Sequence, residues 1–302
     1  MFRNRFALVA VTLVAVVALV AGCSGSTAGA KKVVVGSKDF TENILMGEMV
    51  AQLIEGNTDI KVERKLNLGG TKVNFDGMRN GDLDMYLDYD GTAYSVHLKI
   101  KDPITDPDAV YPRVKQEFED KFDLTWSKPL GFNNTYAIAM PRKLAEQYQI
   151  KTISDLAKYP SQFVFGTTNE FMGRTVDGFY PFTKTYGIKF KDVKKMEAGL
   201  RYNAIKKDAI QVMDAYATDG KLKEFDMMIL KDDKKFFPPY NAAYVIRMDT
   251  LKKYPGLLDV VNKLSGQLND QTMQELNWRV DAKGETVEAV AKDFLKSKGL
   301  LK

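Results

Sequence analysis

Cysteine and histidine are almost absent from this chain of 302 residues, which contains one of each, Cys23 and His97. A lone cysteine cannot form a disulfide within the chain, and a lone histidine does not make a metal site. Nucleophile–base triads normally require a histidine, and neither a G-x-S-x-G nor a P-loop pattern occurs. We therefore predict a protein that is not an enzyme, with no metal and no cofactor, and we expect His97 at the surface or in a loop.

Strong charge of one sign is also missing, because 44 lysines and arginines face 39 aspartates and glutamates, a formal net charge of +5. No basic run alternates with aromatic residues, which is the pattern of a nucleic-acid-binding surface. We therefore expect no nucleic acid among the partners. Past the N-terminal segment, no stretch reaches the roughly 20 apolar residues that a membrane-spanning helix needs.

The N-terminus carries the one long hydrophobic run. Two arginines precede an uncharged apolar stretch at residues 7–20, whose length suits a signal peptide and is short for a membrane span. The stretch leads into VAGC, residues 20–23, which resembles a bacterial lipobox. A plain secretory signal or an uncleaved anchor is the alternative. We predict a lipoprotein signal peptide at 1–22, a lipid on Cys23, a flexible tether at 23–30 and anchoring to the outer, extracytoplasmic face of the cell membrane.

The rest of the chain alternates between two hydrophobic periods. Strand-like segments occur at 33–35, 60–66, 85–89, 135–140, 163–166, 214–218 and 227–230. Helical spacing occurs from Ile44 to Ile54, at about 72–80, at 174–186 and at 287–295. This β-α-β alternation predicts α/β lobes with largely parallel sheets. We expect Trp126 and Trp278 to be packing residues.

A series of motifs makes the sequence resemble a known family. These are GSKDFTEN (36–43), LGGT (68–71), GDLDMYLDYDGT (81–92), GFNNTYAIAM (131–140), FMGR (171–174), DAYATDG (214–220) and FFPPYNAAYVIR (236–247). Together, and in this order, they resemble the osmoprotectant-binding proteins of glycine betaine/carnitine/choline ABC importers, in the branch that includes the archaeal ProX-type receptors. Each motif alone is weak, whereas the ordered set covers the chain beyond the tether.

The resemblance implies a type II periplasmic-binding-protein fold, with two α/β lobes joined by two crossovers and a ligand cleft between them. On this sequence, lobe one would comprise 31–134 plus 237–302 and lobe two 135–236. It also implies partners, namely a quaternary-ammonium small molecule, an ABC permease and a separate ATPase. The lobes would close on the solute by hinge motion near 134–136 and 235–238.

The chemistry of a quaternary ammonium explains why such a site would be aromatic. The cation has no N–H to donate, so the negative faces of aromatic rings are its efficient partners, each worth up to about 2 kcal/mol when desolvated. The family's cage is built mainly from tyrosines, and the matching positions are Tyr89, Tyr136, Tyr216 and Tyr240. Any one of these, taken alone, would be interpreted first as an ordinary core or surface tyrosine, and it is the position of all four in the motifs that favours the cage.

The resemblance implies that the anionic end of the solute binds Arg174, Lys38 and Thr92. Arg174 could instead form a local ion pair with Glu170 or Asp177, Lys38 could be solvated, and Thr92 could cap a helix. Asn134 stands where archaeal members have an acidic residue, so the rings would carry more of the cation binding. Asn43 falls where some choline-binding relatives have a glutamine, which would imply a contact with a hydroxyl of the solute. We favour the alternative, that Asn43 is a polar residue on the surface of a helix.

Several rival functions remain open. The same fold could hold ergothioneine, an amino acid or a polyamine, and a primary ammonium would need carboxylates, for which Asp39, Asp88 and Asp90 are candidates. A sensory lipoprotein that delivers nothing is possible, and an enzyme would need a carboxylate or lysine site of unrecognised type. Among methylated ammonium solutes, Arg174 favours a carboxylated one.

Overall fold

The structure is a computed structural model of the chain and describes residues 31–102 and 107–301. Contacts divide the chain at Lys32, and everything below concerns the unit Val33–Lys302. The predicted signal peptide at 1–22, the lipidation site Cys23 and the tether 23–30 lie outside the described residues. None of the described helices is sufficiently long and apolar to cross a membrane.

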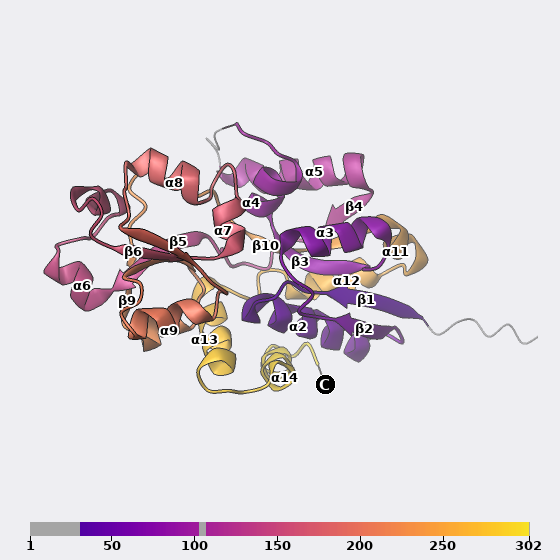
Figure 1. The fold of residues 1–302 in the computed structure, drawn as a ribbon. Coiled ribbons are helices and arrows are strands. Elements are labelled where there is room, and N and C mark those ends of the chain that lie inside the picture. Colours follow the sequence, from indigo (N-terminus) through magenta and orange to yellow (C-terminus); the bar gives the residue numbers. More distant parts are fainter. Residues whose placement is uncertain (1–30, 103–106, 302) are drawn as a thin grey trace, which may run out of the picture. The chain divides into compact units, whose positions relative to one another are not determined.

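The strands form two five-stranded sheets, one in each of two lobes (Figure 1). The first sheet has the order β2-β1-β3-β10-β4, with β1 (Lys32–Gly36), β2 (Lys61–Lys65), β3 (Met85–Tyr89), β4 (Leu124–Trp126) and β10 (Ala242–Arg247). The second has the order β7-β6-β8-β5-β9, with β5 (Tyr136–Pro141), β6 (Val164–Thr167), β7 (Asp192–Lys195), β8 (Val212–Tyr216) and β9 (Met227–Leu230). The predicted two-lobed α/β fold is therefore confirmed.

Both sheets are mixed, but the strands β1, β3 and β4 of the first sheet share one direction, as do β6, β7, β8 and β9 of the second. The expectation of largely parallel sheets is therefore correct except for β10 and β5. β1 runs parallel to β3, and β6 runs parallel to β7 and β8, as β-α-β units require. In contrast, β10 runs antiparallel to β3 and β4, and β5 runs antiparallel to β8 and β9. β5 and β10 are the strands that follow each passage of the chain from one sheet to the other. No helix of their own sheet leads into them, so nothing forces them to run parallel.

Helices flank both sheets. With the first sheet lie α2 (Thr41–Asn57), α3 (Thr71–Asn80), α4 (Asp90–Thr92), η1 (Ala93–His97), η2 (Pro107–Ala109), α5 (Val110–Phe122), α11 (Met248–Lys253), α12 (Leu257–Val261), η4 (Asn262–Leu264), α13 (Asp270–Asp281) and α14 (Val287–Ser297). With the second lie α6 (Arg142–Gln147), η3 (Ile153–Lys158), α7 (Asn169–Gly173), α8 (Phe179–Tyr186), α9 (Leu200–Lys206) and α10 (Lys221–Glu224). The helices expected from residue 44, near 72–80 and at 287–295 are confirmed.

The single helix expected at 174–186 is instead interrupted. α7 ends at Gly173, Arg174 is extended with φ −74° and ψ 126°, and α8 starts only at Phe179. The chain turns back sharply at Gly178, where a Cβ atom would lie 2.4 Å from the carbonyl oxygens of Phe171 and Arg174. The break frees the Arg174 side chain from a helix surface and directs it towards the other lobe.

The chain passes from the first sheet to the second between β4 and β5, and returns between β9 and β10. The two crossover segments touch, because the Asn134 N–H donates to the Tyr240 carbonyl at 3.1 Å and the Tyr240 N–H donates to the Asn133 side chain at 2.8 Å. The lobe boundaries given above, 31–134 plus 237–302 and 135–236, remain a prediction.

The two tryptophans have different surroundings. Trp126 is buried in the first lobe, with its ring 5.3 Å from that of Phe118. Trp278, on α13, borders a groove that also includes Leu222 of α10 and Met227 of β9. A Cβ on Gly220 would lie 2.4 Å from the Trp278 backbone nitrogen, so the end of the second lobe packs closely against α13.

Candidate ligand-binding site

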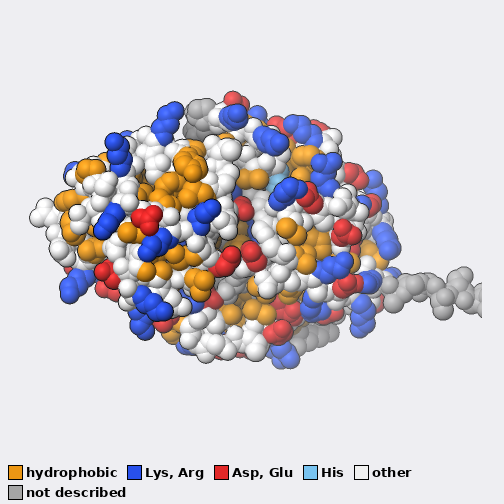
Figure 2. All heavy atoms as spheres, in the orientation of Figure 1, with side chains coloured by type: hydrophobic (Ala, Val, Ile, Leu, Met, Phe, Trp, Pro, Cys, Tyr) orange, Lys and Arg blue, Asp and Glu red, His pale blue; other side chains and the backbone are white. Residues whose placement is uncertain are grey.

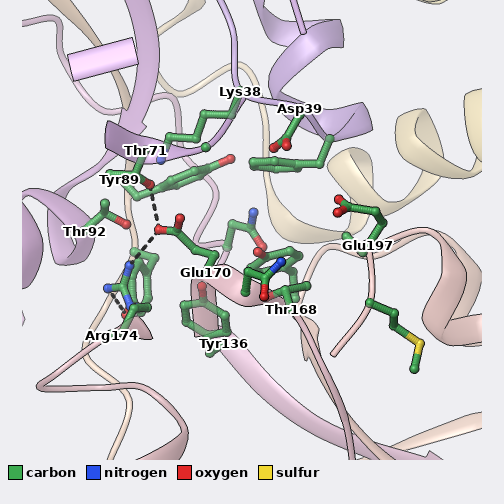
Figure 3. Close-up of a pocket in the computed structure, with 18 residues that line it drawn as sticks. Lys38, Asp39, Thr71, Tyr89, Thr92, Tyr136, Thr168, Glu170, Arg174 and Glu197 are labelled. Carbon is green, nitrogen blue, oxygen red and sulfur yellow. Dashed lines mark hydrogen bonds and ion pairs between the residues drawn. The ribbon is translucent and has the colours of Figure 1, made fainter. Parts of the chain in front are cut away.

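All eight residues expected to bind ligand line one cavity of about 250 Å³: Lys38, Tyr89, Thr92, Asn134, Tyr136, Arg174, Tyr216 and Tyr240. The cavity is also lined by Asp39, Phe40, Gly70, Thr71, Thr168, Asn169, Glu170, Met196, Glu197 and Ala198. Figure 3 shows Lys38, Thr71 and Tyr89 from the first lobe facing Tyr136, Thr168 and Glu170 from the second. In Figure 2, several acidic side chains lie beside a central hollow of the molecule, and side chains of both charges are spread over the rest of this face.

Strand ends position three of the four tyrosines. Tyr89 is the last residue of β3 and Tyr216 the last of β8, while Tyr136 is the first residue of β5. Antiparallel pairing sets Tyr136 directly opposite Tyr216, so two rings on neighbouring strands reach the cavity together. Tyr240 lies on the returning crossover, two residues before β10.

The rings of three of these tyrosines are neighbours. The centroid of Tyr136 lies 5.1 Å from that of Tyr216 and 5.5 Å from that of Tyr240, with interplanar angles of 45° and 81°. Phe40 stacks on Tyr216 at 5.5 Å. Burial raises the pKa of the phenols of Tyr89, Tyr136, Tyr216 and Tyr240, so the rings stay uncharged near neutral pH. The arrangement presents several π-faces to one small volume.

Arg174 joins the lobes beside these rings. Its guanidinium donates to both carboxylate oxygens of Asp177, at 2.7 and 2.6 Å, and to the Ser95 hydroxyl of the first lobe at 2.9 Å. It also donates to the Tyr240 hydroxyl at 2.9 Å, and its Cζ atom lies 5.3 Å from the Tyr136 ring centroid. Arg174 forms an ion pair with Asp177, and its guanidinium lies 3.6 Å from the Glu170 carboxylate. The local ion pairs considered as an alternative are therefore present, and Arg174 lines the cavity as well.

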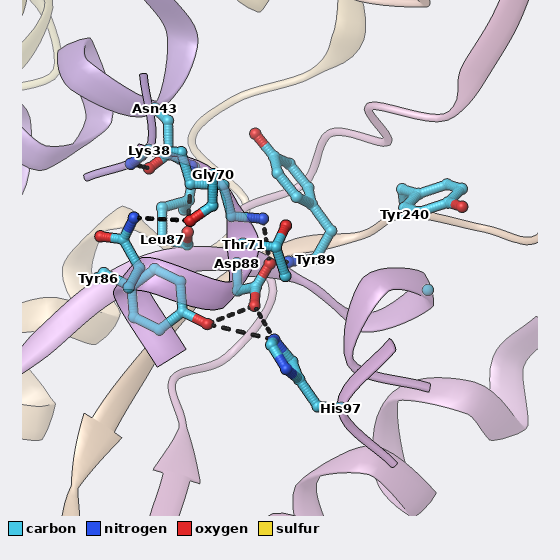
Figure 4. A network of polar contacts seen from close by, with 12 residues as sticks. Lys38, Asn43, Gly70, Thr71, Tyr86, Leu87, Asp88, Tyr89, His97 and Tyr240 are labelled. Atoms are coloured by element: carbon cyan, nitrogen blue, oxygen red, sulfur yellow. Dashed lines mark hydrogen bonds and ion pairs between the residues drawn. The ribbon is translucent and has the colours of Figure 1, made fainter. Parts of the chain in front are cut away.

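Lys38 is buried rather than solvated (Figure 4). Its ammonium donates to Asp88 at 2.7 Å and lies 5.3 Å from the centroid of the Tyr89 ring. Burial would raise the pKa of Asp88, but the charge of Lys38 and the hydrogen bond from His97 outweigh this effect and lower it. Lys38 therefore lies in the cavity wall with its side chain paired to Asp88.

Two side chains are buried in this network against expectation: His97 was expected at the surface or in a loop, and Asn43 on a helix surface. The His97 side chain stacks on Phe75 at 3.9 Å, and its Nε2 atom lies 3.0 Å from Asp88. The Asn43 side chain accepts the Lys38 N–H at 2.7 Å and donates to the Leu87 carbonyl at 3.1 Å. The expectations failed because a single position in the sequence does not reveal the buried partner that it satisfies.

Thr92 and Asn134 complete the expected set. Thr92 lies within α4 and is buried, but its side chain makes no cap of a helix N-terminus. The Asn134 side chain donates to Glu42 at 2.8 Å, and its amide oxygen is buried without a hydrogen-bond partner in the described structure. Asn134 thus leaves one acceptor unsatisfied in the wall of the cavity.

Two carboxylates at the site were not expected to be functional. Glu170 lines the cavity and accepts the Thr71 hydroxyl of the other lobe at 2.8 Å. Glu42 lies behind Tyr89 and Asn134, which both donate to it. Glu42 belongs to the motif GSKDFTEN, and Glu170 directly precedes the motif FMGR. This closeness to the motifs was the available signal. Across residues 31–102 and 107–301, no cluster of three or more histidine, cysteine, aspartate or glutamate side chains suits a metal ion.

Solved structures place the fold among two-lobed solute-binding proteins. A glycine betaine/carnitine/choline ABC transporter structure matches with a TM-score of 0.74 and 35% identity, covering 90% of this chain and 99% of that one. The closed, glycine betaine-bound form of the lactococcal protein OpuAC has a TM-score of 0.61 at 15% identity, over 90% of this chain and 100% of that one, which shows the fold alone.

Sequence comparison identifies the family. Residues 31–297 match the substrate-binding domain of ABC-type glycine betaine transport systems, and the chain belongs to this family. It is 38% identical to the carnitine transport binding protein OpuCC of Listeria monocytogenes over 262 residues, 86% of this chain and 85% of that protein. It is also 38% identical to the ergothioneine transport protein EgtU of Helicobacter pylori over 271 residues, 89% of this chain but only 48% of that protein. The chain thus spans about half the length of EgtU.

Proposed function

We propose that this protein is the extracytoplasmic solute-binding subunit of an ABC importer and captures a quaternary-ammonium compatible solute such as glycine betaine, carnitine or choline. The observation that carries the proposal is the convergence of four tyrosines, from both lobes and the returning crossover, on one cavity that also holds Lys38 and Arg174. Tyr89, Tyr136 and Tyr240 are buried, and Tyr216 is partly buried. We infer that it binds and delivers the solute without converting it chemically. The named relatives support this role.

The two ends of the solute would bind different walls. Tyr89, Tyr136, Tyr216 and Tyr240 would enclose the methylated cation with their π-faces, and Asn134 would face it with its free amide oxygen. Lys38, Thr92 and Arg174 would receive a carboxylate, through an ammonium, a hydroxyl and a guanidinium. Contacts with both walls exist together only when the lobes are closed, so the solute would stabilise closure.

Delivery would require a permease and a separate ATPase subunit, since the proposed solute-binding subunit supplies no transport energy. Lipidation of Cys23 would hold the protein on the outer face of the cell membrane, with 23–30 as a tether. A radiolabelled lipid precursor tests this part, because the label should enter the normal chain and not the Cys23→Ser variant.

Calorimetric titration tests the ligand class. Glycine betaine, carnitine or choline should bind with about micromolar affinity, whereas glycine, which has a primary ammonium, should bind at least about 100-fold more weakly. Glycine has the same carboxylate as glycine betaine, so the comparison isolates the methylated cation. Equal binding of glycine, or no binding of any methylated ammonium, would contradict the proposal.

Ergothioneine, itself a trimethylated ammonium solute, is the second candidate. A second cavity of about 290 Å³ adjoins the first and shares Phe40, Asn134 and Tyr216 with it. The additional space and its carboxylates would receive the N–H groups of a ring that glycine betaine lacks. Tighter binding of ergothioneine than of glycine betaine in the same titration would favour this candidate.

The carboxylates named from the sequence for a primary-ammonium ligand lie mostly outside the cavity wall. Of these three, only Asp39 lines the cavity, where Glu170 and Glu197 lie as well. Asp88 is paired with Lys38, and Asp90 accepts hydrogen bonds from Gly91 and from Asn241. Two of the three carboxylates are therefore already occupied by partners inside the protein.

A further inference from the structure

Glu42 is a buried carboxylate held only by neutral donors among its recorded hydrogen bonds. The Tyr89 hydroxyl donates to it at 2.6 Å, the Asn134 amide at 2.8 Å, the Thr218 hydroxyl at 2.5 Å and the Asn277 amide at 3.1 Å. Only 3% of the residue is exposed. Four donors orient the carboxylate, but they supply no positive charge to balance it, and a buried ion without a counter-charge is costly.

The position of Glu42 connects it to the tyrosine cavity. Two of its four donors, Tyr89 and Asn134, are themselves walls of that cavity, so one side chain separates the carboxylate from the space. Its other two donors, Thr218 after β8 and Asn277 on α13, come from different segments of the chain. A cation held by the Tyr89 ring would lie within range of the Glu42 charge, through an interior that screens it weakly.

We propose that Glu42 is the counter-charge of the bound quaternary ammonium, acting through Tyr89 and Asn134, and that it makes capture of the cation depend on its own ionisation. This inference rests on the proposed function and adds the residue that replaces the acidic group missing at Asn134. Glu42 is a positioning and specificity residue, since it reaches the solute only through its two neighbours.

The charges around Glu42 allow this ionisation to respond to the ligand. Burial raises the pKa of Glu42 to about 7, and the hydrogen bonds from Thr218, Tyr89 and Asn277 only partly oppose that rise. Asp219 raises it further. The other titratable and charged groups facing it are Tyr89 and, around the second cavity, Asp39, Glu197, Arg201, Tyr202, Tyr216, Lys221 and Asp281. Arg201 is already paired with Asp214 and Asp219.

The sign of the pH effect follows from linkage. A bound cation favours the ionised carboxylate. The affinity for the solute is therefore highest above the pKa of Glu42 in the free protein and declines as the pH falls through about 7. The solute itself does not titrate in this range, because a quaternary ammonium has no proton to lose. Binding below pH 8 must therefore release part of a proton from the protein.

Glycine betaine and choline are the probes, titrated into the purified protein at pH 6 and pH 8. We expect both to bind about fivefold more weakly at pH 6, since a tenfold preference for ionised Glu42 corresponds to one pKa unit. Near pH 7 the measured enthalpy should change with the ionisation enthalpy of the buffer. The Glu42→Gln variant should bind both probes about tenfold more weakly at pH 8 and lose the pH dependence.

Two controls separate charge from structure. Glu48 lies on the same helix, is equally buried at 3% exposure and pairs with Arg64 at 2.8 Å, so Glu48→Gln makes the same chemical change elsewhere and should leave both affinities unchanged. The carbon isostere 3,3-dimethylbutanoate has the shape and carboxylate of glycine betaine but no cation. The Glu42→Gln variant should bind this isostere no more weakly than the wild type does, even if both bind it weakly.

The outcomes distinguish the two levels of the proposal. If neither probe binds at any pH, the proposed function fails and the role of Glu42 fails with it. If both bind with the same affinity at pH 6 and pH 8, with no buffer-dependent enthalpy, only the role of Glu42 is overturned. The wild-type buffer experiment needs no variant, so it decides the matter even if Glu42→Gln does not fold.

Discussion

At the scale of the residue, Tyr216 tests the cage most cleanly. Its ring contacts Tyr136 and Phe40, whereas the hydroxyl of Tyr240 is already tied to Arg174 and Asp177. We expect Tyr216→Ala to weaken the best ligand at least about tenfold, because one desolvated cation–π contact is worth up to about 2 kcal/mol. Calorimetry measures the loss.

Tyr216→Phe is the matched control for this change. It keeps the π-face and removes only the hydroxyl, so its affinity should stay within about threefold of that of the wild type. Equal losses in the two variants would assign the effect to the hydroxyl, and no loss in either would remove Tyr216 from the proposed cage.

The expected site residues could be named from the sequence because each occurs in a motif, but their partners could not. Asp88 lies beside Tyr89 in the motif YLDYDGT, yet its contacts with Lys38 and His97 span 50 and 9 residues. The four donors to Glu42 are 47 to 235 residues away from it. Such partners depend on tertiary packing, which local spacing does not encode.

At the scale of the element, α14 depends on the cap at its N-terminus. Thr286 accepts the Ala289 N–H at 3.2 Å, and the helix buries Val290, Ala291, Phe294 and Leu295 as it packs on α2. We expect Thr286→Ala to cost about 1 kcal/mol of unfolding free energy, equivalent to roughly 2–4 °C in thermal midpoint. Thermal unfolding followed by circular dichroism measures it.

Ligand affinity should not change in Thr286→Ala, because α14 contributes no residue to the cavity wall. Ser297→Ala, at the other end of the helix, removes a hydroxyl that donates to Phe294 at 2.7 Å and caps no N-terminus. A larger loss of stability in Ser297→Ala than in Thr286→Ala would contradict the assigned cap.

Elements with a strong period were predicted well, and those set by long-range pairing were not. β3 and β9 have the expected bounds, Met85–Tyr89 and Met227–Leu230. α5 was not expected, although Val110, Val114 and Phe118 recur at helical spacing and are buried. The antiparallel direction of β10 could not be predicted, because it depends on a partner, β3, more than 150 residues earlier.

At the scale of the whole molecule, hydrogen bonds that join the lobes should contribute to affinity. The Ser95 hydroxyl of the first lobe accepts from Arg174 of the second at 2.9 Å. A hydrogen bond to a charged group is worth about 1.5–3 kcal/mol. We expect Ser95→Ala to weaken the best ligand about tenfold while its saturated complex keeps the same radius of gyration in small-angle scattering.

Ser265→Ala is the control for the loss of a hydroxyl. Its oxygen donates to the Pro129 carbonyl at 3.0 Å, and both residues flank the first sheet. Affinity should therefore be unchanged. If the two variants bind equally well, the Ser95–Arg174 contact does not contribute to closure.

The chain has only two tryptophans, and their positions make the intrinsic fluorescence of the protein sensitive to movement between the lobes. Trp126 is sealed inside one half, whereas Trp278 borders the groove towards α10 and has the Lys283 ammonium 4.2 Å from its ring centroid. Relative rotation of the halves would alter the local field around the second indole and spare the first. The fluorescence of the unlabelled protein would then contain a component from Trp278 that changes on closure and a constant component from Trp126 that serves as an internal reference.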